Sequence, residues 1–297
     1  MSIFRPEHKA RTSFDLYSSF SHFMPDGGQV VVLLLFMLLG TVLANIVVLL
    51  LNLVPGAGAM QTYMMLISYP IMFIPAMIYS ANKSRNNEMF QNGIPVDRNN
   101  FGSLGGIALG VMTIIATLAA SVLTEPLQML LPQTPEWFEN VMKQMLNDTP
   151  LWVSFLSVSI LAPVFEEWLC RGMILRGLLL RMKPLWAMVV SALIFGLIHM
   201  NPWQALPAFC LGMLFAYVYY RTGSLKLTML MHFANNTFAL IASNIDSIKD
   251  IDFLADILST WEYAVLIAAA LFLLVLFIRI IRRTVPLPQE SVSEAKE

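Results

Sequence analysis

Apolar stretches of about twenty residues recur along this 297-residue chain, and they constrain its fold more than any other feature. About 20 consecutive apolar residues in a helix cross the roughly 30 Å hydrocarbon core of a bilayer. A soluble chain carries roughly a quarter charged residues, whereas only 12% of the residues are charged here. We therefore expect an all-α, polytopic transmembrane helical bundle in an integral membrane protein.

The apolar windows predict about eight spans, near residues 29–53, 61–81, 103–124, 151–170, 185–200, 204–220, 225–244 and 262–281. Cytoplasmic loops of membrane proteins are enriched in Lys and Arg. With both termini cytoplasmic, sixteen of the 18 Lys and Arg lie on the cytoplasmic side, and only Lys143 and Lys249 lie outside. We expect a cytoplasmic segment over 1–28, a transmembrane domain over 29–284 and a disordered cytoplasmic tail over 285–297.

Two adjacent acids, Glu166 and Glu167, end the apolar run of the fourth predicted span. A charged side chain at mid-bilayer costs about 2.5–3.5 kcal/mol on translocon scales, so it is rarely kept without a task. On a helix Glu167 and Arg171 lie at i and i+4 and can form an ion pair. Glu166 points about 100° away, so it can face a cavity while Arg171 holds Glu167. The alternative interpretation is that the acids only mark a cytoplasmic helix end.

Imidazole and amide side chains occupy two further spans. His199 follows Phe195 by four residues, and Asn236 follows His232 by four residues. One such residue alone usually serves helix packing. Together with Glu166, however, these residues supply a general base and hydrogen-bond donors on three helices. Hydrolysis of an amide bond requires both, because a base takes a proton from water and donors stabilise the oxyanion.

Three patterns that occur in order on separate spans resemble the motifs of the CPBP intramembrane proteases: Glu166-Glu167-x-x-x-Arg171, Phe195-x-x-x-His199 and His232-x-x-x-Asn236. This family includes the type II CAAX prenyl endopeptidases and proteins linked to bacteriocin processing and immunity. The resemblance covers roughly residues 150–245, the motif core of the predicted domain. It implies a helical membrane core that cleaves peptide bonds in a cavity open toward the cytoplasm.

The resemblance also implies a role for each residue of these motifs. Glu166 resembles the base that activates water, with His199 assisting it. The other four residues are implied to act as two pairs, the oxyanion-stabilising His232 and Asn236 and the supporting ion pair of Glu167 and Arg171. The implied partner is a membrane-associated or lipidated protein or peptide, with no nucleic acid, and we expect a prokaryotic plasma membrane as the location.

Three alternatives remain open. A zinc-dependent protease would use Glu166, His199 and His232 as ligands, since two histidines and a glutamate form a recognised catalytic zinc set, although the chain has no His-Glu-x-x-His helix. We favour no cofactor. A non-enzymatic immunity or scaffold protein would keep the motifs for folding. A transporter would also keep polar residues in its spans, but the paired broken helices of two repeated halves are absent from this sequence.

Helical depth tests whether the candidate residues can meet. With a rise of 1.5 Å per residue, a fourth helix ending at Arg171 places Glu166 about 7 Å from the inner boundary and His199 about 22 Å from it. A fourth helix that continues to about Arg181 places Glu166 near 22 Å, level with His199. We therefore predict a long fourth helix in which Arg171 is buried in an ion pair.

Overall fold

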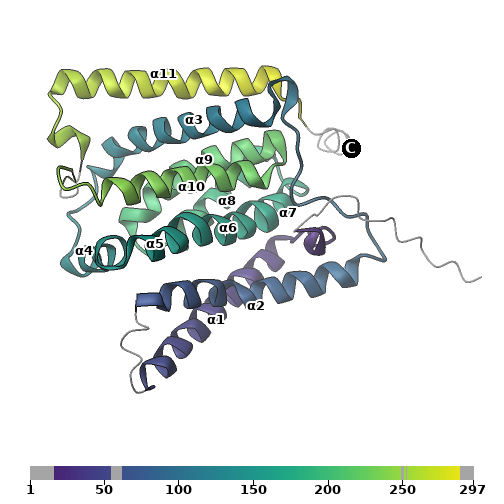
Figure 1. Ribbon diagram of the computed structural model, residues 1–297. Helices are drawn as coiled ribbons and strands as arrows, with labels where there is room; N and C mark the ends of the chain where they lie inside the picture. The colour runs from purple at the N-terminus through teal and green to yellow at the C-terminus, as the bar shows by residue number, and fades with distance from the viewer. Residues whose placement is uncertain (1–16, 55–61, 249–250, 252, 288–297) are drawn as a thin grey trace, which may run out of the picture.

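The structure, a computed structural model, describes residues 17–54, 62–248, 251 and 253–287. Every regular element in these ranges is helical, and the long helices lie side by side in a bundle (Figure 1). The predicted all-α class is therefore confirmed. The described α-helices are α1 (Gly27–Asn52), α2 (Met64–Asn87), α3 (Gly105–Gln128), α4 (Glu136–Lys143), α5 (Leu151–Ser154), α6 (Ala162–Glu167), α7 (Arg176–Leu179), α8 (Pro184–Leu197), α9 (Pro202–Thr222), α10 (Leu225–Ala242) and α11 (Thr260–Thr284).

Long apolar helices identify the protein as an integral membrane protein. Five helices within the described ranges are long and apolar enough to cross a bilayer: Gly27–Asn52, Met64–Asn87, Gly102–Gln128, Leu151–Leu179 and Thr260–Thr284. Large apolar side chains such as Ile107 and Phe272 point outward from them, with 87% and 66% of their surface exposed. Such surfaces suit contact with lipid. The shorter α8, together with α9 and α10, lies in the same bundle (Figure 1), and a count of eight spans stays a prediction.

The fourth predicted span is one continuous helix, Leu151–Leu179. It passes Arg171 and ends close to the expected Arg181, so the prediction of a long fourth helix is confirmed. Within it, α5, α6 and α7 are separated by the π-helical stretches η5 (Phe155–Leu161) and η6 (Trp168–Leu175). The two π-helical stretches flank α6, which ends at Glu167. Because π turns occur frequently at functional sites, α6 is a candidate position for such a site.

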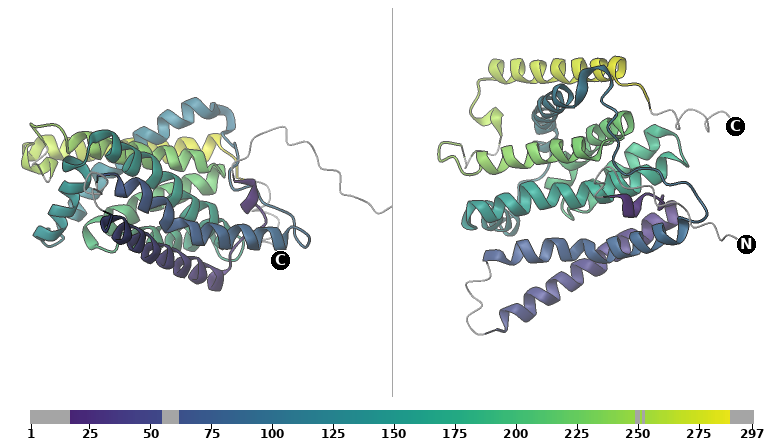
Figure 2. Two further views of the ribbon diagram at one scale, coloured as in Figure 1. Left: turned by 60° about the horizontal axis from the view of Figure 1, so that its bottom comes forward. Right: turned by 45° about the vertical axis from the view of Figure 1, so that its right-hand side comes forward.

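The helices α1 and α2 form a hairpin at one side of the bundle, and α11 lies at the opposite side next to α3 (Figures 1 and 2). Gly40 allows α1 to approach α2 closely, since a Cβ atom there would lie 2.0 Å from the carbonyl oxygen of Met72. Small residues commonly permit such backbone contact in membrane helices. Within the hairpin, α2 contacts the fourth helix at η5 and α6.

The described part of the predicted N-terminal segment packs against the end of the fourth helix. The guanidinium of Arg176, which is 5% exposed, donates hydrogen bonds to the backbone carbonyls of Phe20 at 2.8 Å and Phe23 at 2.6 Å. A charged group this deeply buried needs such partners, so residues near Phe20 belong to the folded body. Residues 1–16 and 288–297 of the predicted terminal segments lie outside the described residues.

The predicted span 185–200 is too long, because α8 ends at Leu197. Asn201 caps the following helix, α9, by accepting a hydrogen bond from the backbone N–H of Gln204 at 2.8 Å. Pro202 occupies the first helical position of α9, where a proline is tolerated. A new helix therefore begins here, and His199 lies in the turn between α8 and α9 rather than on a helix.

Candidate active site

A fully buried ion pair forms the centre of the candidate site. Nη1 of Arg171 lies 2.9 Å from Oε1 of Glu167, and neither side chain has any exposed surface. Nη2 of Arg171 donates to the carbonyl of Gly212 at 3.0 Å. The guanidinium also lies over the rings of Phe195 and Phe215, at 4.3 and 5.4 Å from their centroids. The predicted burial of Arg171 in an ion pair is thus confirmed, and four groups from three helices hold the guanidinium in place.

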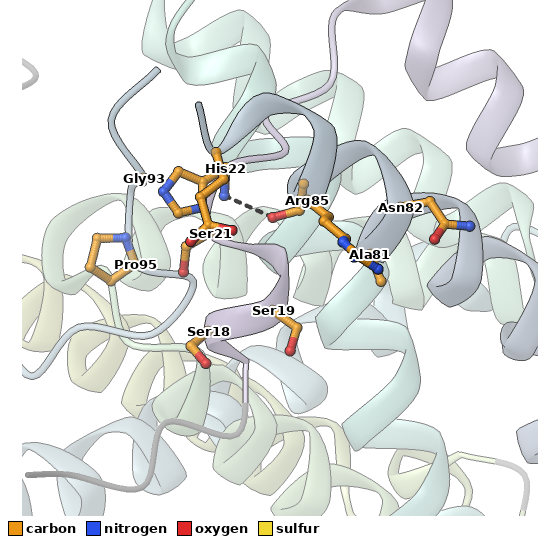
Figure 3. Close-up of a pocket in the computed structure, with 11 residues that line it drawn as sticks. Ser18, Ser19, Ser21, His22, Ala81, Asn82, Arg85, Gly93 and Pro95 are labelled. Carbon is orange, nitrogen blue, oxygen red and sulfur yellow. Dashed lines mark hydrogen bonds between the residues drawn. The ribbon is translucent and has the colours of Figure 1, made fainter. Parts of the chain in front are cut away.

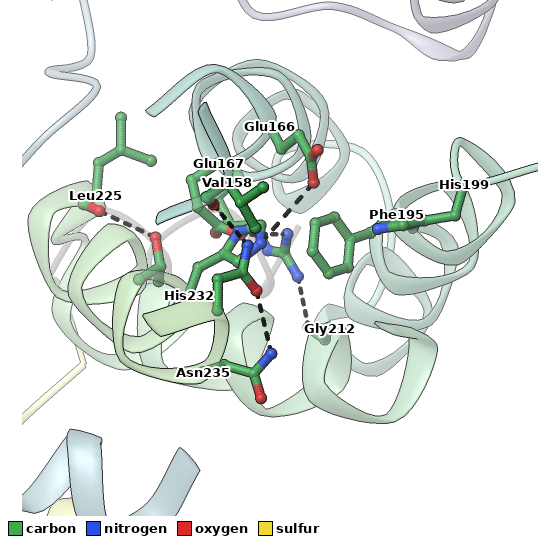
Figure 4. Close-up of polar contacts among 12 residues, drawn as sticks. Val158, Glu166, Glu167, Phe195, His199, Gly212, Leu225, His232 and Asn235 are labelled. Atoms are coloured by element: carbon green, nitrogen blue, oxygen red, sulfur yellow. Dashed lines mark hydrogen bonds and ion pairs between the residues drawn. The ribbon is translucent and has the colours of Figure 1, made fainter. Parts of the chain in front are cut away.

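The same carboxylate orients His232 on α10. Nδ1 of His232 lies 3.2 Å from Oε1 of Glu167, and an ionised carboxylate can only accept a hydrogen bond, so Nδ1 carries the hydrogen. The imidazole also packs edge-on against Phe195, with ring centroids 5.3 Å apart. Its other nitrogen, Nε2, lies 4.0 Å from Oε2 of Glu166. Figure 4 shows these groups converging from the fourth helix and α10.

Glu166 faces both His232 and a residue that the sequence did not single out. Its Oε1 accepts a hydrogen bond from the hydroxyl of Tyr69 on α2. Its Oε2 is buried and accepts no hydrogen bond from the described protein groups. Only 8% of the Glu166 surface is exposed. A tyrosine in an apolar span carries no distinguishing signal, because it suits both lipid interfaces and helix packing.

Asn236 is held from two sides. Its Nδ2 donates to the carbonyl of Val158 at 2.9 Å, and its Oδ1 accepts from Nδ2 of Asn235 at 3.2 Å. Asn235 in turn accepts a hydrogen bond from Oγ of Ser121 on α3 at 2.7 Å. On α10, Asn236 lies one turn after His232, so the two side chains share a helix face.

The π-helical stretch explains why a backbone carbonyl is free to bind Asn236. The N–H of Ala162, which would bond Val158 in an α-helix, bonds Ser157 instead. The next possible donor is residue 163, which is a proline and has no N–H. The carbonyl of Val158 therefore needs an outside donor, because an unpaired backbone group inside a membrane protein is costly. The amide of Asn236 meets that need.

His199 adjoins this cluster only through Phe195 in the described part of the chain. Its Nδ1 contacts the carbonyl of Phe195 at 2.9 Å, and its ring packs edge-on against the Phe195 ring at 5.5 Å. No hydrogen bond or ion pair joins His199 to Glu166 in the described part of the chain, so the expected meeting of these two residues is not found. Its place in the turn after α8 accounts for this, and Met200 next to it has a left-handed backbone with φ 57°.

The zinc alternative requires three ligands around one point. Glu166 and His232 approach within 4.0 Å, but His199 contacts Phe195 instead of joining them. Among the described residues, no group of three His, Cys, Asp or Glu side chains is arranged to hold a metal ion. The proposed zinc set does not fit this arrangement.

A separate cavity lies between the N-terminal segment and the end of α2 (Figure 3). Its volume is about 590 Å³, and Ser18, His22, Arg85 and Pro95 are among the residues that line it. None of the six predicted site residues contributes to its wall. The cavity therefore gives no support to the catalytic prediction, which depends on the cluster around Glu166.

One comparison with known proteins covers the segment of the chain that carries the cluster. Residues 148–238 match the family model described as type II CAAX prenyl endopeptidase Rce1-like. No curated protein and no solved structure matches the chain. The matched segment contains the fourth helix, the turn after α8 and His232 on α10, and it therefore includes all six predicted site residues. Residues 148–238 thus form a domain similar to the Rce1-like type II CAAX prenyl endopeptidases, and this match supports an intramembrane protease as the activity of the chain.

Proposed function

We propose that Glu166 is the general base of this protease and that His232 and Asn236 bind the oxyanion of the tetrahedral intermediate. The supporting observation is the 4.0 Å separation between Oε2 of Glu166 and Nε2 of His232. This distance is too long for a direct hydrogen bond, but one water molecule or one substrate oxygen can contact both atoms. The two groups thus face the same reacting centre.

In the proposed reaction, a water molecule attacks the carbonyl carbon of the scissile peptide bond. The new C–O bond forms as Oε2 of Glu166 takes the proton from the water. The carbonyl oxygen becomes an oxyanion, which Nε2 of His232 and the amide of Asn236 stabilise as donors. The C–N bond then breaks, and Glu166 returns the proton to the leaving amine.

The buried ion pair supports the donor role of His232. When His232 carries both protons, the charges of Glu166, Glu167, Arg171 and His232 sum to zero. A balanced set is the least costly way to keep ionised groups in a low-dielectric interior. Glu167 fixes the orientation of the imidazole through Nδ1, as second carboxylates commonly do for catalytic histidines.

His199 is assigned an assisting role near the rim of the site. Nδ1 is occupied by the carbonyl of Phe195, which leaves Nε2 to contact substrate or water. The ring of Phe195 touches both imidazoles, at 5.5 Å for His199 and 5.3 Å for His232.

The proposed substrate is a membrane-associated or lipidated protein or peptide. Two features support this choice, the match to a family of prenyl endopeptidases and the position of the catalytic cluster among helices apolar enough to cross a membrane. A peptide with a lipid anchor would reach such a site by moving within the bilayer. We propose a prenylated peptide with a C-terminal CAAX sequence as the first probe.

The experiment uses the purified full-length protein in detergent, with a prenylated CAAX peptide that carries a fluorophore and a quencher on opposite sides of the cleavage point. Cleavage by the wild type and loss of at least 10²-fold in kcat for Glu166→Gln are expected, because positioned proton transfer contributes about 10²–10⁴-fold. Glu125→Gln is a matched control, since Glu125 is a buried acid of α3 that contacts Ala255 instead of the cluster. Equal cleavage by wild type and Glu166→Gln would refute the assigned role.

A further inference from the structure

A residue outside the matched domain contacts the proposed base directly. Tyr69 lies on α2, 97 residues before Glu166 in the sequence, and its hydroxyl donates a hydrogen bond to Oε1 of Glu166. The family model begins only at residue 148. The hairpin of α1 and α2 therefore contributes a polar group to a site that the matched segment alone does not complete.

Aromatic packing fixes the direction of the Tyr69 hydroxyl. The ring of Tyr69 lies 5.7 Å from the ring of Phe73 and 6.5 Å from the ring of Phe165. Phe73 and Phe165 stack on each other, with centroids 5.2 Å apart and planes at 19°. Phe165 is the residue immediately before Glu166, so the same aromatic cluster holds both the donor and the backbone that carries the acceptor.

The hydrogen bond controls how Glu166 presents its second oxygen. A carboxylate rotates about the bond to its side chain unless one oxygen is held. Because Tyr69 holds Oε1, Oε2 is directed toward Nε2 of His232, at 4.0 Å. Rigid support of a catalytic group by a neighbouring hydrogen bond keeps it within the narrow geometry that proton transfer requires.

We propose that Tyr69 is a positioning residue for Glu166 and that the α1–α2 hairpin is in this way part of the active site. This inference rests on the proposed function of Glu166 as general base. Tyr69 takes no proton in the reaction and acts only by directing Oε2 of Glu166. The three sequence motifs do not include Tyr69. Its hydroxyl reaches Glu166 only because α2 packs against α6.

The test compares Tyr69→Phe with the wild type, using the prenylated CAAX peptide as the probe. Loss of a hydrogen bond to a charged group is expected to lower kcat roughly tenfold while KM stays unchanged, because only the approach to the transition state is affected. Tyr79→Phe is the matched control, since Tyr79 lies on the same helix but packs against Phe23 and Phe36. It should keep the wild-type kcat.

A second measurement tests the contact without using activity. Melting temperatures are compared for Tyr69→Phe, for Glu166→Met, which has no oxygen to accept the hydrogen bond, and for the double variant. Residues in direct contact give non-additive changes, so the loss caused by Tyr69→Phe should be smaller when Glu166 is already replaced. Additive changes in melting temperature would overturn the inference.

The outcomes separate this inference from the proposed function. If Glu166→Gln abolishes cleavage and Tyr69→Phe has the kcat of the wild type, Tyr69 is not a positioning residue while Glu166 keeps its role. If a raised KM accounts for the whole defect of Tyr69→Phe, the hydroxyl serves substrate binding and the inference is also overturned. If the wild type does not cleave the peptide, the proposed substrate is wrong, and the melting temperatures alone decide whether Tyr69 is coupled to Glu166.

Discussion

Replacing Arg171 by Met should destabilise the protein more than any other single charge removal in the fourth helix. The variant leaves the carboxylate of Glu167 buried with 0% exposure and His232 as its remaining polar partner. Breaking a buried ion pair by removing one partner costs about 3–5 kcal/mol, because the other charge stays desolvated. The variant also loses the hydrogen bond to Gly212 at 3.0 Å.

The position of Cys170 provides an assay for this loss. Cys170 has 0% exposure and precedes Arg171 in the sequence, so a thiol-reactive fluorophore reports unfolding around the ion pair. In a Cys210→Ala background, the melting temperature of Arg171→Met should fall by on the order of 10 °C, given about 2–4 °C per kcal/mol in large domains. Arg181→Met is the control, because Arg181 is exposed and its guanidinium donates to the carbonyl of Gly177, one turn earlier in the chain.

The double variant Glu167→Gln/Arg171→Met separates charge burial from loss of packing. It removes both charges. The glutamine side chain at position 167 still has an oxygen that can accept a hydrogen bond from Nδ1 of His232. Replacing a buried pair by neutral groups is often close to neutral for stability, so most of the lost melting temperature should return. A double variant no more stable than Arg171→Met, or a single variant as stable as the wild type, would refute this explanation.

Other contacts support three more predictions. Gly40→Ala should lower the melting temperature by several degrees in the same thiol assay, because its Cβ would lie 2.0 Å from the carbonyl oxygen of Met72. Asn235→Ala should lower kcat for the peptide several-fold at unchanged KM, since Asn235 orients Asn236; an unchanged kcat would contradict that role. Exhaustive chelation should leave cleavage intact, whereas loss of cleavage that zinc restores would favour the metal-dependent alternative.

Local rules of helix geometry correctly predicted the buried ion pair and the long fourth helix. The spacing of Glu167 and Arg171 by four residues is enough to bring their side chains together on any helix. The depth calculation required only the rise per residue, and the helix does continue to Leu179. Both predictions concern residues within one helix. There the fixed rise and turn per residue convert a separation in sequence directly into a distance and a direction in space.

The contacts of Glu166 and Asn236 could not be predicted in this way. Tyr69 is 97 residues from Glu166, and only the packing of α2 on the fourth helix brings them together. The carbonyl of Val158 is available to Asn236 because a π-helical stretch changes the local hydrogen-bond pattern. A regular α-helical period cannot anticipate such a change, because a π turn adds a residue and shifts the helical phase of the residues after it.

The position of His199 in a turn has a local cause that the hydropathy window obscured. The apolar run continues past Leu197, so a window of constant length includes His199 in the span. Asn201 and Pro202, however, form a start signal for the next helix, and this signal was present in the sequence. Giving capping residues more weight than hydropathy would have placed His199 in the turn.

The most direct test of the catalytic role of Glu166 measures new protein N-termini in cells that produce equal amounts of wild type, Glu166→Gln or Glu125→Gln. N-terminal labelling and mass spectrometry of membrane and secreted proteins detect cleavage products whatever the substrate is. We predict cleavage products that occur with the wild type and with Glu125→Gln and are absent with Glu166→Gln. The same products in all three cultures would contradict the role of Glu166 as the catalytic base.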